Sequence, residues 1–271
     1  MLFADNGRRV PSPMMRVFSN SPSNYYKINQ PVNDYHLILE KLKANNLVDN
    51  NISSLVFKEK TTLLKNRIIS NEYFKNLIKG VHIPFAYKAI DQNKEMGSEL
   101  EEFLLPAIQK SFNEKYPNSK FKAILQSNSI LKNNLVIDRN SRYDEFVNKS
   151  AVNTVVGWYF PQALQEFDIA SQRSQMKELP QPSEFGVCLS GAKDIASALV
   201  GTPELLISSE FYTPILCLSS YVHADPRLVL LLKAYGPHME FWCMSQMLTK
   251  NVTQVSEQWT GGLTIYEIIL N

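Results

Sequence analysis

The two parts of this chain of 271 residues differ in composition, and this difference constrains the fold more than any single motif does. Residues 1–150 contain 22 basic and 15 acidic residues, a balance of +7, whereas residues 151–271 contain 6 basic and 11 acidic residues, a balance of −5. All three cysteines and all three tryptophans lie in the second part. A basic polar part and an acidic apolar part indicate two structural units with different roles.

From this division we expect three segments. Residues 1–31 contain four prolines and four serines with little periodicity, which predicts an extended N-terminal arm. Residues 32–150 are predicted to form a basic, mainly helical unit, and residues 151–271 an apolar α+β unit. The overall content of 44% apolar and 20% charged residues is typical of a folded protein and argues against extensive disorder.

Apolar spacing and capping signals predict several helices and a few short strands. Gly261-Gly262, flanked by residues that favour strands, predicts a tight C-terminal hairpin. We therefore predict a helix-dominated α+β fold with a small antiparallel sheet that includes this hairpin. The predicted helices cover 33–45, 59–80, 98–112, 192–200, 227–235, which starts after Asp225-Pro226, and 239–248. Two further helix starts are predicted before Pro203 and Pro214, and the predicted strands cover 121–125, 135–137 and 186–188.

One segment, Gly-Val-Cys-Leu-Ser-Gly-Ala-Lys at 186–193, has a pattern that suits catalysis. A strand that ends in a turn and a helix N-terminus presents free amides, which lower the pKa of a nearby thiol. Cys188 as nucleophile, with His223 or His238 as base, would give a cysteine-dependent hydrolase or acyltransferase. The strained nucleophile turn requires glycine two residues after the nucleophile, where this chain has Ser190. We therefore keep catalysis as the alternative and favour a buried small residue at Cys188.

The same segment resembles part of a known loop. Leu189-Ser190-Gly191-Ala192-Lys193 is similar to the Leu-Ser-Gly-Gly-Gly-Ala-Lys-Gly oxyanion loop of patatin-like lipases over about five residues. Two of the loop glycines are absent, Asp194 stands in place of the final glycine, and the chain contains no Gly-X-Ser-X-Gly nucleophile motif. Because the nucleophile is missing, the resemblance implies no lipase activity.

No metal or cofactor is expected. Cys217, His223, His238 and Cys243 are soft ligands, but their spacing matches none of the compact Cys/His pairs that bind zinc. No glycine-rich segment ends in Gly-Lys-Ser/Thr, as a phosphate loop would.

Hydropathy and charge allow membrane insertion, cellular location and nucleic-acid binding to be assessed. The longest unbroken apolar run in the most apolar region is Leu228–Leu232, far short of the ~20 residues that span a bilayer. The three cysteines cannot all pair and have apolar neighbours, which favours a reducing, cytoplasmic location.

Nucleic-acid binding through the basic N-terminal half is a further alternative, but its lysines are scattered rather than clustered on one face.

Protein–protein interaction is the class that remains. Aromatic residues and methionine are enriched at interface cores, so Trp242, Met244 and Tyr266 are candidate partner-binding residues, with Arg8 and Arg9 in the arm. We predict a non-catalytic subunit or adaptor of a larger cytosolic assembly, with other protein subunits as partners. The preference for Lys over Arg and the many Asn and Ile residues suit an AT-rich bacterial genome, for which a secretion-apparatus accessory is one setting.

Overall fold

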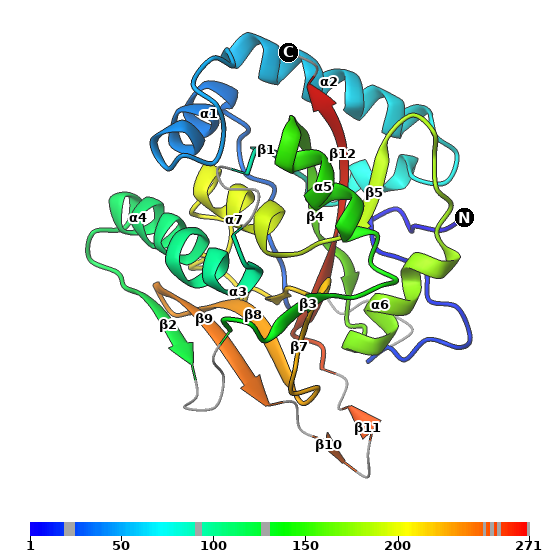
Figure 1. The fold of residues 1–271 in the computed structure, drawn as a ribbon. Helices are drawn as coiled ribbons and strands as arrows, with labels where there is room; N and C mark the ends of the chain where they lie inside the picture. The colour runs from blue at the N-terminus through cyan, green and yellow to red at the C-terminus, as the bar shows by residue number, and fades with distance from the viewer. Residues whose placement is uncertain are drawn as a thin grey trace.

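The computed structural model describes residues 1–18, 25–89, 94–125, 131–245, 248–249, 252–253 and 256–269. In this part, helices surround a large mixed sheet of eight strands, with 34% helix and 28% strand (Figure 1). The helical segments are α1 (Tyr35–Ala44), α2 (Ser54–Ser70), η1 (Lys75–Lys79), α3 (Met96–Glu99), η2 (Leu100–Leu104), α4 (Leu105–Lys115), α5 (Tyr143–Val152), α6 (Ile169–Glu178) and α7 (Ala192–Gly201). The strands are β1 (Ile83–Tyr87), β2 (Phe121–Leu125), β3 (Leu135–Ile137), β4 (Thr154–Gln165), β5 (Gly186–Leu189), β6 (Ile215–Cys217), β7 (Tyr221–His223), β8 (Leu228–Tyr235), β9 (His238–Ser245), β10 (Leu248–Thr249), β11 (Val252–Thr253) and β12 (Trp259–Ile269).

The large sheet has the order β1-β4-β12-β6-β8-β9-β2, and β5 also pairs with β12. The long central strands β4 and β12 are antiparallel, with Thr154 opposite Ile269 at one end and Gln165 opposite Thr260 at the other. β8 and β9 form an antiparallel hairpin, and β2 joins β9 in parallel. Strands from both parts of the chain therefore share one sheet, since β1 and β2 precede residue 151.

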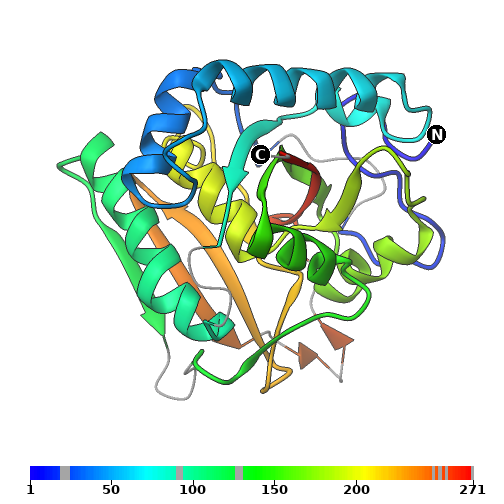
Figure 2. The same cartoon turned by 45° about the horizontal axis from the view of Figure 1, so that its top comes forward.

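Both faces of the central strands are covered. On one face Trp158, Leu263 and Ile265 belong to a buried cluster that includes apolar residues of α2. On the other face Tyr159 and Tyr266 belong to a larger cluster with residues of α7 and α1. Figure 2 shows α2 along one side of the molecule and α4 beside β2 and β9. Strands buried on both faces carry no apolar–polar alternation, so their sequences lack the usual strand signal.

The prediction of a helix-dominated fold with a small sheet is wrong, since the described part contains an eight-stranded mixed sheet. Gly261 and Gly262 lie inside β12 rather than in a turn. A Cβ on Gly262 would lie 2.2 Å from Cε2 of Tyr159, and a Cβ on Gly261 would lie 2.4 Å from Oε1 of Gln172. Glycine is needed at both positions because neighbouring side chains approach the strand closely. A Gly-Gly pair in a sequence can therefore indicate close packing inside a strand as well as a hairpin turn.

The helix predicted at 227–235 is strand β8. Residues 239–245 of the helix predicted at 239–248 belong to β9, and 246–247 lie outside the described residues. The two-residue turn Gly236-Pro237 joins β8 to β9. Gly236 has a φ of +58°, the positive value that hairpin turns require and that glycine adopts without strain. Leu228–Leu232 is buried throughout, as expected of a strand covered on both faces. The helix starts predicted before Pro203 and Pro214 are also wrong, because α7 ends at Gly201 and the described elements that follow are strands.

Other local predictions are confirmed. Helices form at α1 and α7, and strands form at β2, β3 and β5. However, β2 pairs with β9 and β3 with β7, so they make no hairpin together. The helix predicted at 59–80 is confirmed only in part, because α2 ends at Ser70 and the separate 3₁₀ turn η1 covers Lys75–Lys79. The helix predicted from Ser98 begins earlier, with Glu95 as its N-cap. Pro106 lacks an amide, and the helix widens to a π turn at η2 immediately before it.

The N-terminal segment packs on the body of the molecule. Phe3 is fully buried in the cluster beside α2, at a ring-centroid distance of 5.9 Å from Phe74. Single β-bridges join Val17 to Phe167 and Tyr26 to Tyr212. No helix in the described ranges is long and apolar enough to cross a membrane.

Candidate functional site

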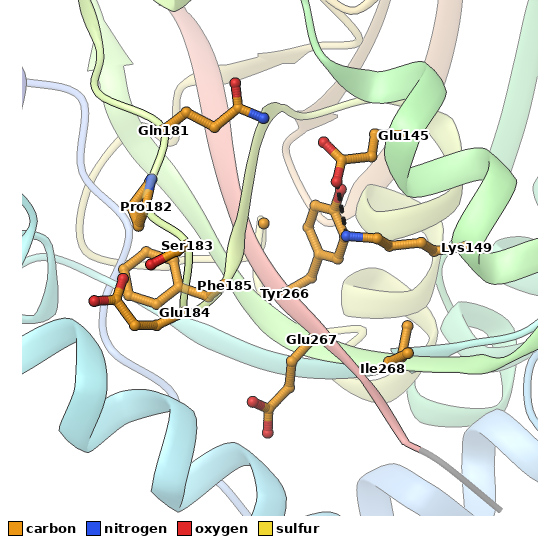
Figure 3. Close-up of a pocket in the computed structure, with 11 residues that line it drawn as sticks. Glu145, Lys149, Gln181, Pro182, Ser183, Glu184, Phe185, Tyr266, Glu267 and Ile268 are labelled. Carbon is orange, nitrogen blue, oxygen red and sulfur yellow. Dashed lines mark hydrogen bonds and ion pairs between the residues drawn. The ribbon is translucent and has the colours of Figure 1, made fainter.

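The candidate site lies at one edge of β12. Along the other edge β12 pairs with β4 as far as Ile269, whereas along this edge it pairs first with β6 and then with β5. The pairing with β5 ends at Tyr266 opposite Gly186. Beyond it, no described strand pairs with Glu267–Ile269 on this side. A pocket of about 210 Å³ opens at this position (Figure 3). We call it the β12 notch; its lining residues are Glu145, Lys149, Gln181, Pro182, Ser183, Glu184, Phe185, Gly186, Tyr266, Glu267 and Ile268.

The notch exists because the chain before β5 turns away from the sheet. Phe185 is buried in the cluster beside α2, with its ring 5.9 Å from that of Phe74 in an edge-on contact. Pro182 has no amide with which to continue a strand ladder. Arg142 fixes the far end of this segment, because its guanidinium donates hydrogen bonds to the carbonyl oxygens of Met176, Leu179 and Pro180 at 2.6, 2.7 and 3.2 Å. The wall of the notch is therefore anchored at both ends.

The ring of Tyr266 forms the floor of the notch and is 1% exposed. It contacts Gly186 on one side and Phe146 on another, in an edge-on arrangement with ring centroids 5.1 Å apart. The ammonium of Lys149 lies 5.4 Å from the centroid of the Tyr266 ring. The Tyr266 hydroxyl points toward the Glu145 side of the notch (Figure 3) and has no hydrogen-bond partner among the described residues. It is a buried polar group whose hydrogen-bonding capacity is unused.

Three carboxylates and one ammonium surround this floor. Glu145 accepts a hydrogen bond from Lys149 at 2.7 Å, one helical turn away on α5. Glu267 forms an ion pair with Arg67 of α2. Glu184 is exposed and has no ion-pair or hydrogen-bond partner among the described residues. One carboxylate at the rim is thus without a cation.

The notch presents a phenol, three carboxylates, one ammonium and a strand edge. Burial raises the pKa of Tyr266 above its ordinary value, so its hydroxyl stays protonated at neutral pH. The exposed strand edge adds backbone donors and acceptors. The only thiol nearby is Cys188 on β5, which is fully buried.

The structure places Cys188 and the two histidines on different strands. Burial, and then the nearby Asp194 carboxylate, raise the pKa of Cys188 well above that of a free thiol. His223 lies on β7, where its Nδ1 accepts from the amide of Asp225 at 2.9 Å. His238 begins β9, where its Nδ1 accepts from the amide of Lys120 at 3.0 Å. In this arrangement the thiol is protonated and covered, and its pKa is set by burial and by carboxylates.

The segment 189–194 builds a buried polar cluster at the start of α7. The carboxylate of Asp194 accepts hydrogen bonds from the amide of Gly191 and the hydroxyl of Tyr143, each at 2.9 Å, and from the hydroxyl of Thr264. Lys193 forms an ion pair with Glu99, and both side chains are less than a tenth exposed. The residues that resemble a lipase loop therefore cap a helix and tie α7 to α5 and β12.

The other predicted binding residues lie apart from the notch. Trp242 and Met244 are half-buried on β9, beside Leu231. The indole of Trp242 donates to Glu240 at 2.8 Å, and Lys233 lies 4.2 Å from its ring centroid.

Arg8 and Arg9 are buried against their own chain. Arg8 pairs with Glu166 at 3.6 Å, and Arg9 pairs with Glu178 at 3.2 Å and donates to Gln175 at 2.9 Å. In this arrangement the two arginines attach the N-terminal segment to the body of the protein.

Among the predicted residues, the structure brings only Tyr266 into the notch. Sequence reasoning did not identify Glu145, Lys149, Glu184 or Glu267 as its neighbours. A local signal exists for Glu145 and Lys149, whose spacing of four residues suits a helical ion pair. Nothing in the sequence links either of them to Glu184 or Glu267.

Within the described ranges, no group of three or more His, Cys, Asp or Glu side chains is arranged to hold a metal ion. Comparison of the chain with protein-family models, curated proteins and solved structures finds no match.

Proposed function

We propose that this protein is a non-catalytic, protein-binding subunit of a larger assembly, and that it receives an extended segment of its partner in the β12 notch. The observation that carries the proposal is the end of the β5 pairing at Tyr266 while β12 continues to Ile269. An added segment would take the position that β5 leaves and would pair with the free backbone groups of β12. Such strand addition is a common mode of peptide recognition, in which backbone pairing provides affinity and side-chain pockets provide specificity.

The composition of the notch supports binding of a polypeptide. The floor is an aromatic ring, the rim is charged, and the edge of β12 beyond Tyr266 has no described strand partner. Tyrosine is enriched at the centres of interfaces. Arg142 holds the carbonyl oxygens of Met176, Leu179 and Pro180, directly before the wall at residues 181–186, so little order has to be gained when a partner binds.

A cytoplasmic location belongs to the same proposal. Cys188, Cys217 and Cys243 are all free and buried. Thiols of this kind suit a reducing compartment, where no disulfide is needed for stability.

The proposal is tested with tagged full-length protein, by affinity capture from the cells that express it followed by light scattering of the eluted complex. Wild-type protein is expected to retain one partner in stoichiometric amount. Ser183 is exposed and lines the notch, so Ser183→Trp fills the notch without burying a new group in the core. This variant is expected to retain at least about tenfold less partner.

The matched control is Ser209→Trp, which places the same large side chain on an exposed loop outside the notch. It is expected to retain the partner as wild type does, with an unchanged unfolding midpoint for all three proteins. A wild-type protein that elutes as a monomer without a stoichiometric partner would refute the proposal. Equal retention by Ser183→Trp and wild type would place the binding site elsewhere.

A further inference from the structure

We infer that the segment received by the β12 notch is basic, with Lys or Arg side chains alternating with apolar ones, and that Glu184 pairs with one of its cations. This inference rests on the proposed function and specifies the chemistry of the partner. It is argued from the two faces of the strand and from the charges at the rim.

Alternation follows from the geometry of β12. Successive side chains of a strand point to opposite faces of the sheet, so an added strand would present its own side chains alternately to each face. Tyr266 packs against Phe146 of α5 on one face. The next residue, Glu267, pairs with Arg67 of α2 on the other face. Neighbouring residues of the added segment therefore meet different surroundings, one aromatic and one charged.

The aromatic face already holds a cation. The ammonium of Lys149 lies 5.4 Å from the Tyr266 ring centroid and is bonded to Glu145. A second cation at this position would be repelled by Lys149, whereas an uncharged apolar side chain would not be. On this face the segment is therefore expected to carry apolar residues.

The rim of the notch has one carboxylate in excess. The carboxylates of Glu145, Glu184 and Glu267 meet two cations, Lys149 of the lining and Arg67 of α2. Two of these carboxylates are paired within the protein, whereas Glu184 has no ion-pair partner in the part of the chain that the structure describes. A basic side chain of the segment would compensate Glu184, and an acidic one would add a further like charge. For an exposed pair this preference corresponds to about a two- to fivefold change in affinity.

The test uses three acetylated and amidated heptapeptides that alternate valine with lysine, with serine or with glutamate. Each is titrated into isotope-labelled full-length protein and followed by the amide shifts of residues 181, 183–186 and 267–269. The lysine peptide is expected to bind most tightly and the glutamate peptide at least about fivefold more weakly, with shifts at these residues. Added salt is expected to reduce the difference, because exposed charges are screened.

Two variants test whether Glu184 causes the preference for the lysine peptide. Glu184→Gln keeps the size of the side chain and is expected to reduce the preference for the lysine over the serine peptide by about two- to fivefold. Glu59→Gln is the matched control, since Glu59 is an exposed carboxylate of α2 that does not line the notch, and the preference is expected to be unchanged.

Equal affinity of the three peptides at the notch would overturn the inference on charge and leave strand addition standing. Shifts outside the notch only, or none at all, would overturn the inference as well. Partner capture by Ser183→Trp tests the proposed function, and the peptide titration tests the charge of the segment. A failure of one can therefore be distinguished from a failure of the other.

Discussion

Gly186 lies directly against the ring of Tyr266, so closely that a Cβ on Gly186 would lie 2.3 Å from Cζ of the tyrosine. The contact joins Gly186, the first residue of β5, to the ring that forms the floor of the notch. It also explains glycine at this position, because any larger residue would displace the ring. The shape of the notch therefore depends on the absence of a side chain at position 186.

The first prediction concerns this contact. Gly186→Ala is expected to destabilise the protein by about 1–3 kcal/mol, as overpacking of a buried site does, and to weaken partner retention. Urea denaturation measures the free energy of unfolding. In a Tyr266→Ala background the penalty of Gly186→Ala is expected to disappear, because the ring that it strikes is absent. A penalty of equal size in both backgrounds would locate the strain elsewhere.

The second prediction concerns the buried ion pair between Lys193 and Glu99. Glu99→Gln leaves the Lys193 ammonium buried without its counter-charge, so a loss of about 3–5 kcal/mol in the free energy of unfolding is expected. The matched control is Glu40→Gln, which removes an exposed pair with Lys43 on α1 and is expected to cost less than about 0.5 kcal/mol. Equal effects of the two variants in urea denaturation would contradict the structural role of the buried pair.

Sequence patterns predict the elements of this fold where one face is buried and the other is solvated. The buried residues Ile38, Leu39 and Leu42 of α1 repeat with a helical period, and the helix is confirmed. β8 and β12 are covered on both faces, so Leu228–Leu232 shows no apolar–polar alternation. The glycine pair of β12 has the sequence signature of a hairpin turn although it lies inside a strand. These strands are identified only by their long-range partners.

The same limit applies to the notch. Tyr266 is predictable as an aromatic residue suited to an interface, but its neighbours come from α5 and from residues 181–186, far away in the chain. Glu145 and Lys149 show a helical spacing, yet this spacing carries no information about which strand the helix covers. The pocket arises from where β5 stops pairing with β12, which is a property of tertiary packing.

The third prediction concerns the pH dependence of stability. Burial raises the pKa of Asp194 above its ordinary value of 3.8, although hydrogen bonds from Thr264, Gly191 and Tyr143 oppose this effect. A carboxyl whose pKa is raised by folding contributes stability that is fully present below pH 3.8 and is lost as pH rises through its folded-state pKa. The free energy of unfolding of wild type minus that of Asp194→Asn is therefore expected to fall between pH 3.5 and 7.

Taking the difference between the two proteins cancels the other carboxylates, which titrate in both. Asparagine retains an oxygen that can accept from Gly191 and Tyr143, so the variant is expected to fold. A difference that rises with pH would mean that the hydrogen bonds outweigh burial and that the pKa of Asp194 is lowered.

The fourth prediction concerns the thiols. Burial raises the pKa of Cys188 well above the ordinary range and that of Cys217 to about 12, and all three cysteines are buried. A thiol-reactive probe at pH 7 is expected to label Cys188, Cys217 and Cys243 only in urea, at the rate of global unfolding. Peptide mapping by mass spectrometry identifies each site. Preferential labelling of Cys188 in native protein would instead support the cysteine-dependent enzyme.

The fifth prediction concerns the N-terminal segment, which contributes to the core. Phe3 is fully buried in the cluster beside α2 and contacts Phe74. Phe3→Ala is expected to lower the free energy of unfolding by about 3–5 kcal/mol, through lost burial and the cavity that remains. Met14, which is 88% exposed in the same segment, provides the control, and Met14→Ala is expected to change stability by less than about 0.5 kcal/mol. If both variants unfold at the wild-type urea midpoint, residues 1–18 are a detachable arm, and Arg8 and Arg9 become available to a partner.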